Sequence, residues 1–134
     1  MRILISLILG LTLTTMASAD ARAGLADEAD INAGLLTVAV ADKIRRECDD
    51  ISGRLLAARS YVTGLKKMAV DRGYTEAQID AYINDSEEKA QMRERRNAYF
   101  KSKGASNLDA QSLCDLGRAE IRNRSLVGSF LKAK

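Results

Sequence analysis

Apolar residues recur along most of this chain at steps of three and four, which is the spacing of one face of an α-helix. The clearest case is a seam that predicts a helix ending near Arg72, and it consists of Ile51, Leu55, Ala58, Val62, Leu65 and Ala69. Asp50 or Ser52 is expected to cap the start of this helix. Gly73 is expected to end it in the left-handed conformation.

An earlier segment, Ala33 to about Cys48, is apolar on more than one side, with Val40 and Ile44 among its large residues. This pattern predicts a helix at the centre of the fold, and Asn32 is the expected N-cap. Residues 20–32 are mostly small and polar, so we expect them to form a flexible arm before the helix.

Capping residues predict two helices in the middle of the chain. Thr75 and Gln78 form a capping box for a third helix. A fourth is expected from Glu87 to Lys103, ending at Gly104. The cap-rich residues 84–86 separate the two segments, and the sequence leaves open whether they form one bent helix.

The last part of the chain predicts two more helices. A fifth is expected over about Ala110 to Arg122, capped from within residues 107–109. A short last helix is expected to start at the cap Ser125 and to run through Leu131.

These elements predict an all-α protein with a single helical domain over residues 33–134. We expect a compact bundle of about five helices, with the first, second and fifth as its core. The chain has no proline, and no stretch alternates apolar and polar residues long enough to predict a strand.

The first 19 residues have the layout of a secretory signal peptide. Arg2 precedes the almost wholly apolar run Ile3–Leu13, and the small residues 17–19 fit a cleavage site. The apolar run is shorter than the roughly 20 residues that cross a bilayer. We therefore expect cleavage after Ala19, a periplasmic or secreted protein, and no transmembrane segment in the mature chain. The alternative is an uncleaved anchor that includes residues 11–19.

Export affects the interpretation of the two cysteines, Cys48 and Cys114. Paired thiols outside the cytoplasm are usually oxidised, so we expect a disulfide between the first and fifth helices. Gly117, one turn after Cys114, would leave room for a close helix crossing. Two free buried thiols are the alternative. No metal site is expected, because the chain has no histidine and no closely spaced cysteine pair.

The absence of histidine removes the commonest general base, and with it the Ser-His-Asp and Cys-His nucleophile systems. Ser86 to Lys89 matches the S-x-x-K spelling of penicillin-binding enzymes, but those sites need a larger α/β scaffold and a second lysine motif. We assign no catalytic residue and no cofactor. A small envelope enzyme with an unrecognised carboxylate or Ser-Lys site is the alternative function.

The most basic stretch of the chain surrounds Tyr99 and Phe100. We interpret it as a candidate surface for an unknown protein or envelope component, formed by Arg93, Arg95, Arg96, Tyr99, Lys101 and Lys103. The basic side of the second helix is a further candidate, formed by Arg59, Lys66 and Lys67. The simpler explanation is a solvated helix face. A net charge of +3 is too small to indicate a nucleic-acid partner.

Glu120 lies at the edge of the apolar arc of the fifth helix. A half-buried carboxylate needs a compensating partner. Arg45, Arg46 and Arg54 lie near the other end of the expected disulfide. We therefore expect a structural ion pair between Glu120 and one of these arginines, rather than a catalytic acid.

The region from Gly34 to Leu131 contains a pattern of cysteines, glycines and helix-face residues that is specific enough to compare with protein families. The pattern includes residues 38–45, Cys48, Cys114 and residues 119–121. On these residues the chain resembles a family of small exported proteins of unknown function from alphaproteobacteria. The resemblance implies a shared architecture and no activity. Our functional prediction is an exported, non-enzymatic binding or interaction protein on a disulfide-stabilised helical scaffold.

Overall fold

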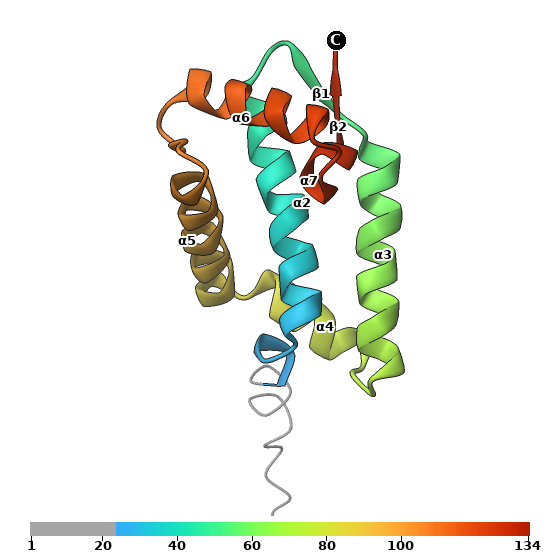
Figure 1. The fold of residues 1–134 in the computed structure, drawn as a ribbon. Helices are drawn as coiled ribbons and strands as arrows, with labels where there is room; N and C mark the ends of the chain where they lie inside the picture. Colours follow the sequence, from blue (N-terminus) through green and yellow to red (C-terminus); the bar gives the residue numbers. More distant parts are fainter. Residues whose placement is uncertain (1–23) are drawn as a thin grey trace, which may run out of the picture.

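The computed structural model describes residues 24–134, which form a bundle of helices around one long central helix (Figure 1). That helix, α2 (Ala29–Glu47), has α5 (Ser86–Ser102) on one side and α3 (Leu55–Asp71) on the other. The predictions of an all-α fold and of a central first helix are confirmed.

The remaining helices close the two ends of this arrangement. α6 (Ala110–Arg122) crosses one end of α2, with the short α7 (Leu126–Ser129) beside it, and α4 (Glu76–Asn84) lies at the opposite end (Figure 1). Each helix within residues 24–134 is too short or too polar to cross a membrane.

Two short strands join parts of the chain that are far apart in sequence. β1 (Ile51–Gly53) pairs antiparallel with β2 (Leu131–Ala133), with Ile51 opposite Ala133. The sequence did not predict these two strands. The expected continuation of the last helix to Leu131 is wrong, because α7 ends at Ser129 and Leu131 begins β2. Strands of three residues are too short to show a readable alternation, and their pairing depends on the tertiary fold.

The segment before α2 is folded in its described part, so the prediction of a flexible arm over residues 20–32 is wrong for residues 24–32. Residues 24–26 are helical. Leu25 is buried in an apolar cluster that also contains Ile31, Leu65, Ala69, Ile79 and Tyr82. The expected signal peptide and residues 20–23 lie outside the described residues.

Asn32 is not the predicted N-cap but a buried residue inside α2. Its side-chain amide donates to the carbonyl oxygens of Leu25 at 2.7 Å and Glu28 at 2.9 Å. Its side-chain oxygen accepts a hydrogen bond from the Tyr82 hydroxyl at 2.7 Å. Asparagine favours caps because it competes for backbone partners. In this protein the Asn32 side chain instead bonds backbone carbonyl groups of residues 25–28 and fixes the turn before α2.

The predicted caps of the middle helices are present. Both halves of the Thr75–Gln78 capping box form, at 3.2 and 2.8 Å. Gly73 and Gly104 adopt φ of 98° and 74°, the left-handed conformation that glycine tolerates without strain.

α4 and α5 are separate helices, which settles the question that the sequence left open. Asp85 between them is extended, with φ −64° and ψ 133°. Its carboxylate accepts hydrogen bonds from the backbone amides of Glu87 and Glu88, both at 3.0 Å, and so caps α5.

The predicted disulfide is present and joins the end of α2 to α6. The Cα atoms of Cys48 and Cys114 are 5.3 Å apart. Nearby, α2 and α6 cross closely at Gly117, where an added Cβ atom would lie 2.6 Å from Cγ2 of Ile44. The helices can approach this closely only because position 117 carries no side chain.

The apolar seam of α3 is buried only in part. Leu65 and Ala69 are buried, but Leu55 is 60% exposed and Val62 is 36% exposed. The seam therefore extends beyond the core to an open part of the molecule.

Candidate functional site

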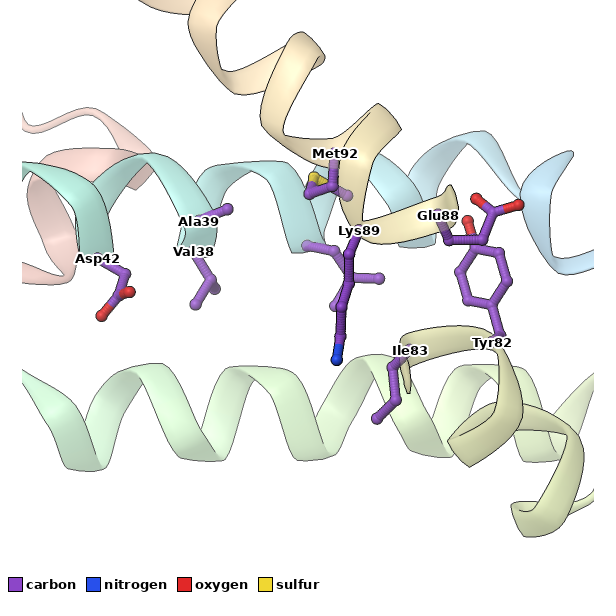
Figure 2. Close-up of a pocket in the computed structure, with 9 residues that line it drawn as sticks. Val38, Ala39, Asp42, Tyr82, Ile83, Glu88, Lys89 and Met92 are labelled. Atoms are coloured by element: carbon purple, nitrogen blue, oxygen red, sulfur yellow. The ribbon is translucent and has the colours of Figure 1, made fainter. Parts of the chain in front are cut away.

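An apolar groove runs along α2, and its largest hollow lies among α2, α4 and α5 (Figure 2). The volume of this hollow is about 280 Å³. Its lining includes Leu35, Val38, Ala39, Ile83, Lys89 and Met92. Figure 2 shows that the labelled lining residues come from these three helices.

Two smaller hollows extend the groove along α2. One of about 70 Å³ shares Leu35, Tyr82 and Ile83 with the largest hollow and reaches Val62 on α3. The other, of about 80 Å³, shares Val38 with it and reaches the opposite end of α3. We call the three hollows together the α2 groove.

α3 and α5 pack on different flanks of α2 (Figure 1). The three hollows of the α2 groove lie along the part of α2 that these two helices leave uncovered. Leu35, Val38 and Ala39 of the central helix are consequently only half-buried. Because α2 is apolar on more than one side, the uncovered part offers an apolar floor.

The α5 wall of the groove is basic. Lys89 lines the largest hollow, and Arg93 and Arg96 follow it at steps of four and three on the same side of the helix. Burial, together with the nearby charges of Arg46 and Arg93, lowers the pKa of Arg96. The Nε atom of Arg96 is buried and has no hydrogen-bond partner among the described residues.

The α3 wall also carries cations. Lys66 lines the groove, and Arg59 lies between Leu55 and Val62 on the same stripe of the helix. Lys66 makes long ion pairs with Glu76 at 3.7 Å and Asp80 at 4.0 Å. The ion pairs found within residues 24–134 include neither Arg59 nor any of the three cations of the α5 wall.

The carboxylate on the floor of the groove already has cationic partners. Asp42 pairs with Arg45 at 2.6 Å and with Arg46. Partial burial works to raise the pKa of Asp42, but hydrogen bonds and charges from these arginines outweigh it and hold that pKa below its ordinary value. A second lining carboxylate, Glu88, lies beside Tyr82 at one end of the groove (Figure 2).

The six residues predicted as an interaction surface on α5 do not share one face. They are spread around the helix because successive residues turn by about 100°. Tyr99 points inward, and Lys103 lies over its ring at 5.6 Å. Arg95 donates to Gln91 at 3.2 Å, and Lys101 is exposed to solvent. Of the six, Arg93 and Arg96 directly continue the stripe that Lys89 begins on α5.

The predicted ion pair of Glu120 is wrong. Glu120 is only 5% exposed, and its carboxylate accepts hydrogen bonds from the Tyr99 hydroxyl at 2.7 Å and from the Ser125 hydroxyl. Arg45 and Arg46 pair with Asp42 instead. The third candidate, Arg54, donates to the carbonyl oxygen of Leu131 at 3.2 Å. Two hydroxyl donors thus supply the partners that burial of the carboxylate requires.

Two other groups within residues 24–134 are a possible set of metal ligands and the Ser86–Lys89 pair. Cys48, Cys114 and Asp50 place potential ligand atoms within 4.8 Å of one another, but the disulfide leaves no thiolate to bind a metal. Asp50 pairs with Arg118 at 2.6 Å. Ser86 is the first residue of α5, and no hydrogen bond joins it to Lys89 in the described structure.

Comparisons with known proteins identify a family for this chain but no activity. No curated protein and no solved structure shows significant similarity to the chain. The sequence profile of a family of unknown function matches residues 23–132, a range that contains both cysteines and all of α2 to α7. The chain therefore belongs to this family of unknown function, DUF5333.

Proposed function

We propose that this protein is an exported, non-enzymatic binding protein of the cell envelope that engages a protein partner through the α2 groove. The observation that carries the proposal is the uncovered apolar strip of the central helix, with a hollow of about 280 Å³ beside it. Apolar concavities of this kind, flanked by polar groups, are typical of binding sites.

Two features support the exported location. Residues 1–19 have the layout of a signal peptide. The disulfide between Cys48 and Cys114 is a bond that persists in oxidising compartments such as the periplasm.

The position of the groove also supports a binding role. Its floor belongs to α2, whose far end is tied covalently to α6 and packs against it at Gly117. A binding surface on a helix held in this way is largely preformed, so that little ordering opposes association.

Site-specific cross-linking in the native cell tests the proposal. A photo-reactive phenylalanine analogue at Val38, on the floor of the groove, is expected to form an adduct with an envelope protein that mass spectrometry can identify. The matched control places the same group at Leu108, which is 92% exposed and lies outside the groove. Failure of Val38 to give an adduct, or the same adduct from both positions, would contradict the proposal.

Cell fractionation tests the exported location separately. The protein is expected in the periplasmic fraction or the medium, with Asp20 as its first residue by N-terminal sequencing. Recovery of the full-length chain from the cytoplasm would contradict export.

A further inference from the structure

We propose that the α2 groove binds an acidic amphipathic α-helix, with the apolar face of that helix on the groove floor and its carboxylates against the cations of both walls. The inference rests on the proposed function and specifies the chemistry of the partner.

The shape of the groove fits a helix. Its three hollows follow α2 from Ile31 to Arg45, which is about 20 Å at the helical rise of 1.5 Å per residue. An elongated apolar channel of this length matches about four turns of a second helix. Amphipathic helices dock in such channels through apolar residues at positions i, i+3, i+4 and i+7.

The charges of the groove select an acidic helix over a basic one. Lys89, Arg93 and Arg96 lie along the α5 wall, and Arg59 and Lys66 lie along the α3 wall. Within residues 24–134, Lys66 forms ion pairs with carboxylates, and the other four cations do not. A helix with carboxylates on both sides of its apolar face would meet them, whereas a basic helix would be repelled.

A further detail also favours an acidic partner. The floor residue Asp42 is already paired with Arg45 and Arg46, so it competes only weakly for the wall cations.

Peptide binding to the purified mature protein tests the inference. The probes are three labelled peptides of about 15 residues, which is about four helical turns. One has leucines at helical spacing flanked by glutamates, the second has lysines in place of those glutamates, and the third is a scrambled version of the first. Fluorescence anisotropy is expected to show that the first binds at least about tenfold more tightly than the other two, with an affinity that falls as salt is added.

Paired variants locate the binding site. Ala39→Trp fills the groove floor and is expected to abolish peptide binding. Ala33→Trp places the same side chain at an exposed position of α2 outside the hollows and is expected to leave peptide binding unchanged.

Lys89→Glu with Arg93→Glu is expected to weaken binding of the acidic peptide by about tenfold. The control Lys101→Glu with Lys132→Glu changes the net charge equally on exposed residues away from the groove. Circular dichroism verifies that each variant is folded.

Several results would overturn the inference. These are equal affinity for the acidic and basic peptides, binding of the scrambled peptide, or the same loss in the control variants.

Binding to anionic phosphatidylglycerol vesicles that is lost in Ala39→Trp would assign the groove to a lipid surface. Self-association that Ala39→Trp removes would assign it to a second copy of the chain. If Val38 cross-links to an envelope protein while the peptides fail, only the partner chemistry is wrong; if Val38 forms no adduct, the proposed function itself fails.

Discussion

At the scale of single residues, two buried polar side chains connect segments that are separate in sequence. Asn32 joins the turn before α2 to Tyr82 of α4. Glu120 joins α6 to Tyr99 of α5 and to Ser125 at the start of α7. Removing one partner of such a group leaves the other buried and unpaired, at a cost of about 1–3 kcal/mol.

The Tyr99–Glu120 contact predicts a loss of stability in alkaline solution. Burial, the hydrogen bond to Glu120 and the charge of that carboxylate raise the pKa of Tyr99 above its ordinary value of 10.0. The folded protein therefore keeps a proton that the unfolded chain releases above pH 10. The resulting stabilisation is fully present below that pH and is lost as the pH rises through the raised pKa.

Urea unfolding between about pH 9 and 12 measures this contribution. The unfolding free energy of the wild-type protein is expected to fall more steeply with pH than that of Tyr99→Phe. Tyr61→Phe, which removes a hydroxyl with no hydrogen bond in the described structure, should follow the wild type. Parallel curves for the wild type and Tyr99→Phe would show that the contact does not form.

Glycine substitutions provide a second prediction at this scale. A Cβ atom at Gly128 would lie 2.1 Å from the backbone oxygen of Glu120, so Gly128→Ala is expected to destabilise the protein by about 1–3 kcal/mol or more. Gly64 has no heavy atom within 4 Å of an added Cβ atom and lies inside α3, so Gly64→Ala should stabilise the protein by about 0.5–1 kcal/mol. Thermal unfolding compares the two variants, and equal shifts would contradict the packing at Gly128.

At the scale of helices and strands, the starts of α4, α5 and α6 are set by local caps and match the sequence-based expectation. The starts of α2 and α3 do not match: α3 begins at Leu55 after Arg54, without the expected side-chain cap from Asp50 or Ser52. α6 runs from Ala110 to Arg122 as expected, with Asp109 as its cap. α2 instead begins four residues before the expected Ala33, at Ala29. The reason is that Leu25, which lies just before α2, is buried in an apolar cluster with residues of α2, α3 and α4. This packing fixes the start of α2 and depends on residues that are distant in sequence.

The capping box of α4 is a local feature with a measurable effect. Thr75→Ala removes the acceptor for the backbone amide of Gln78 and is expected to cost about 1 kcal/mol. Thr63→Ala, an exposed substitution in the interior of α3, should leave stability within about 0.5 kcal/mol of the wild type. Hydrogen exchange should show faster exchange of the α4 amides in Thr75→Ala alone. Unchanged protection of α4 would mean that tertiary packing, not the cap, holds this helix.

At the scale of the whole molecule, one covalent link and one small sheet connect the early and late parts of the chain. The disulfide spans a sequence separation of 66 residues. Beside it, β1 pairs with β2, and Lys134 donates its backbone amide to the carbonyl oxygen of Asp50 at 3.0 Å. The two connections hold the start of α3 and the short α7 at the same end of α2.

Loss of the disulfide is expected to be the largest single stability change. Constraint of the unfolded chain by a loop of this length contributes about 4 kcal/mol in loop-entropy models. Cys48→Ala with Cys114→Ala should therefore lower the urea midpoint strongly, and reductant should bring the wild type to the same midpoint. Reductant should leave the double variant unchanged. A reductant-insensitive wild type would contradict the bond.

The sequence by itself determined the helical class, the caps of α4 to α7, the left-handed Gly73 and the cysteine pairing. Helical period and capping depend on residues within a few positions of one another, and the sequence contains only two cysteines, so a single intramolecular pairing was possible. Only the tertiary structure decided the pairing of β1 with β2, the hydroxyl partners of Glu120 and the α2 groove. Each depends on which distant segments meet, and the groove in particular exists because two helices pack on separate flanks of α2 and leave its remaining apolar surface uncovered.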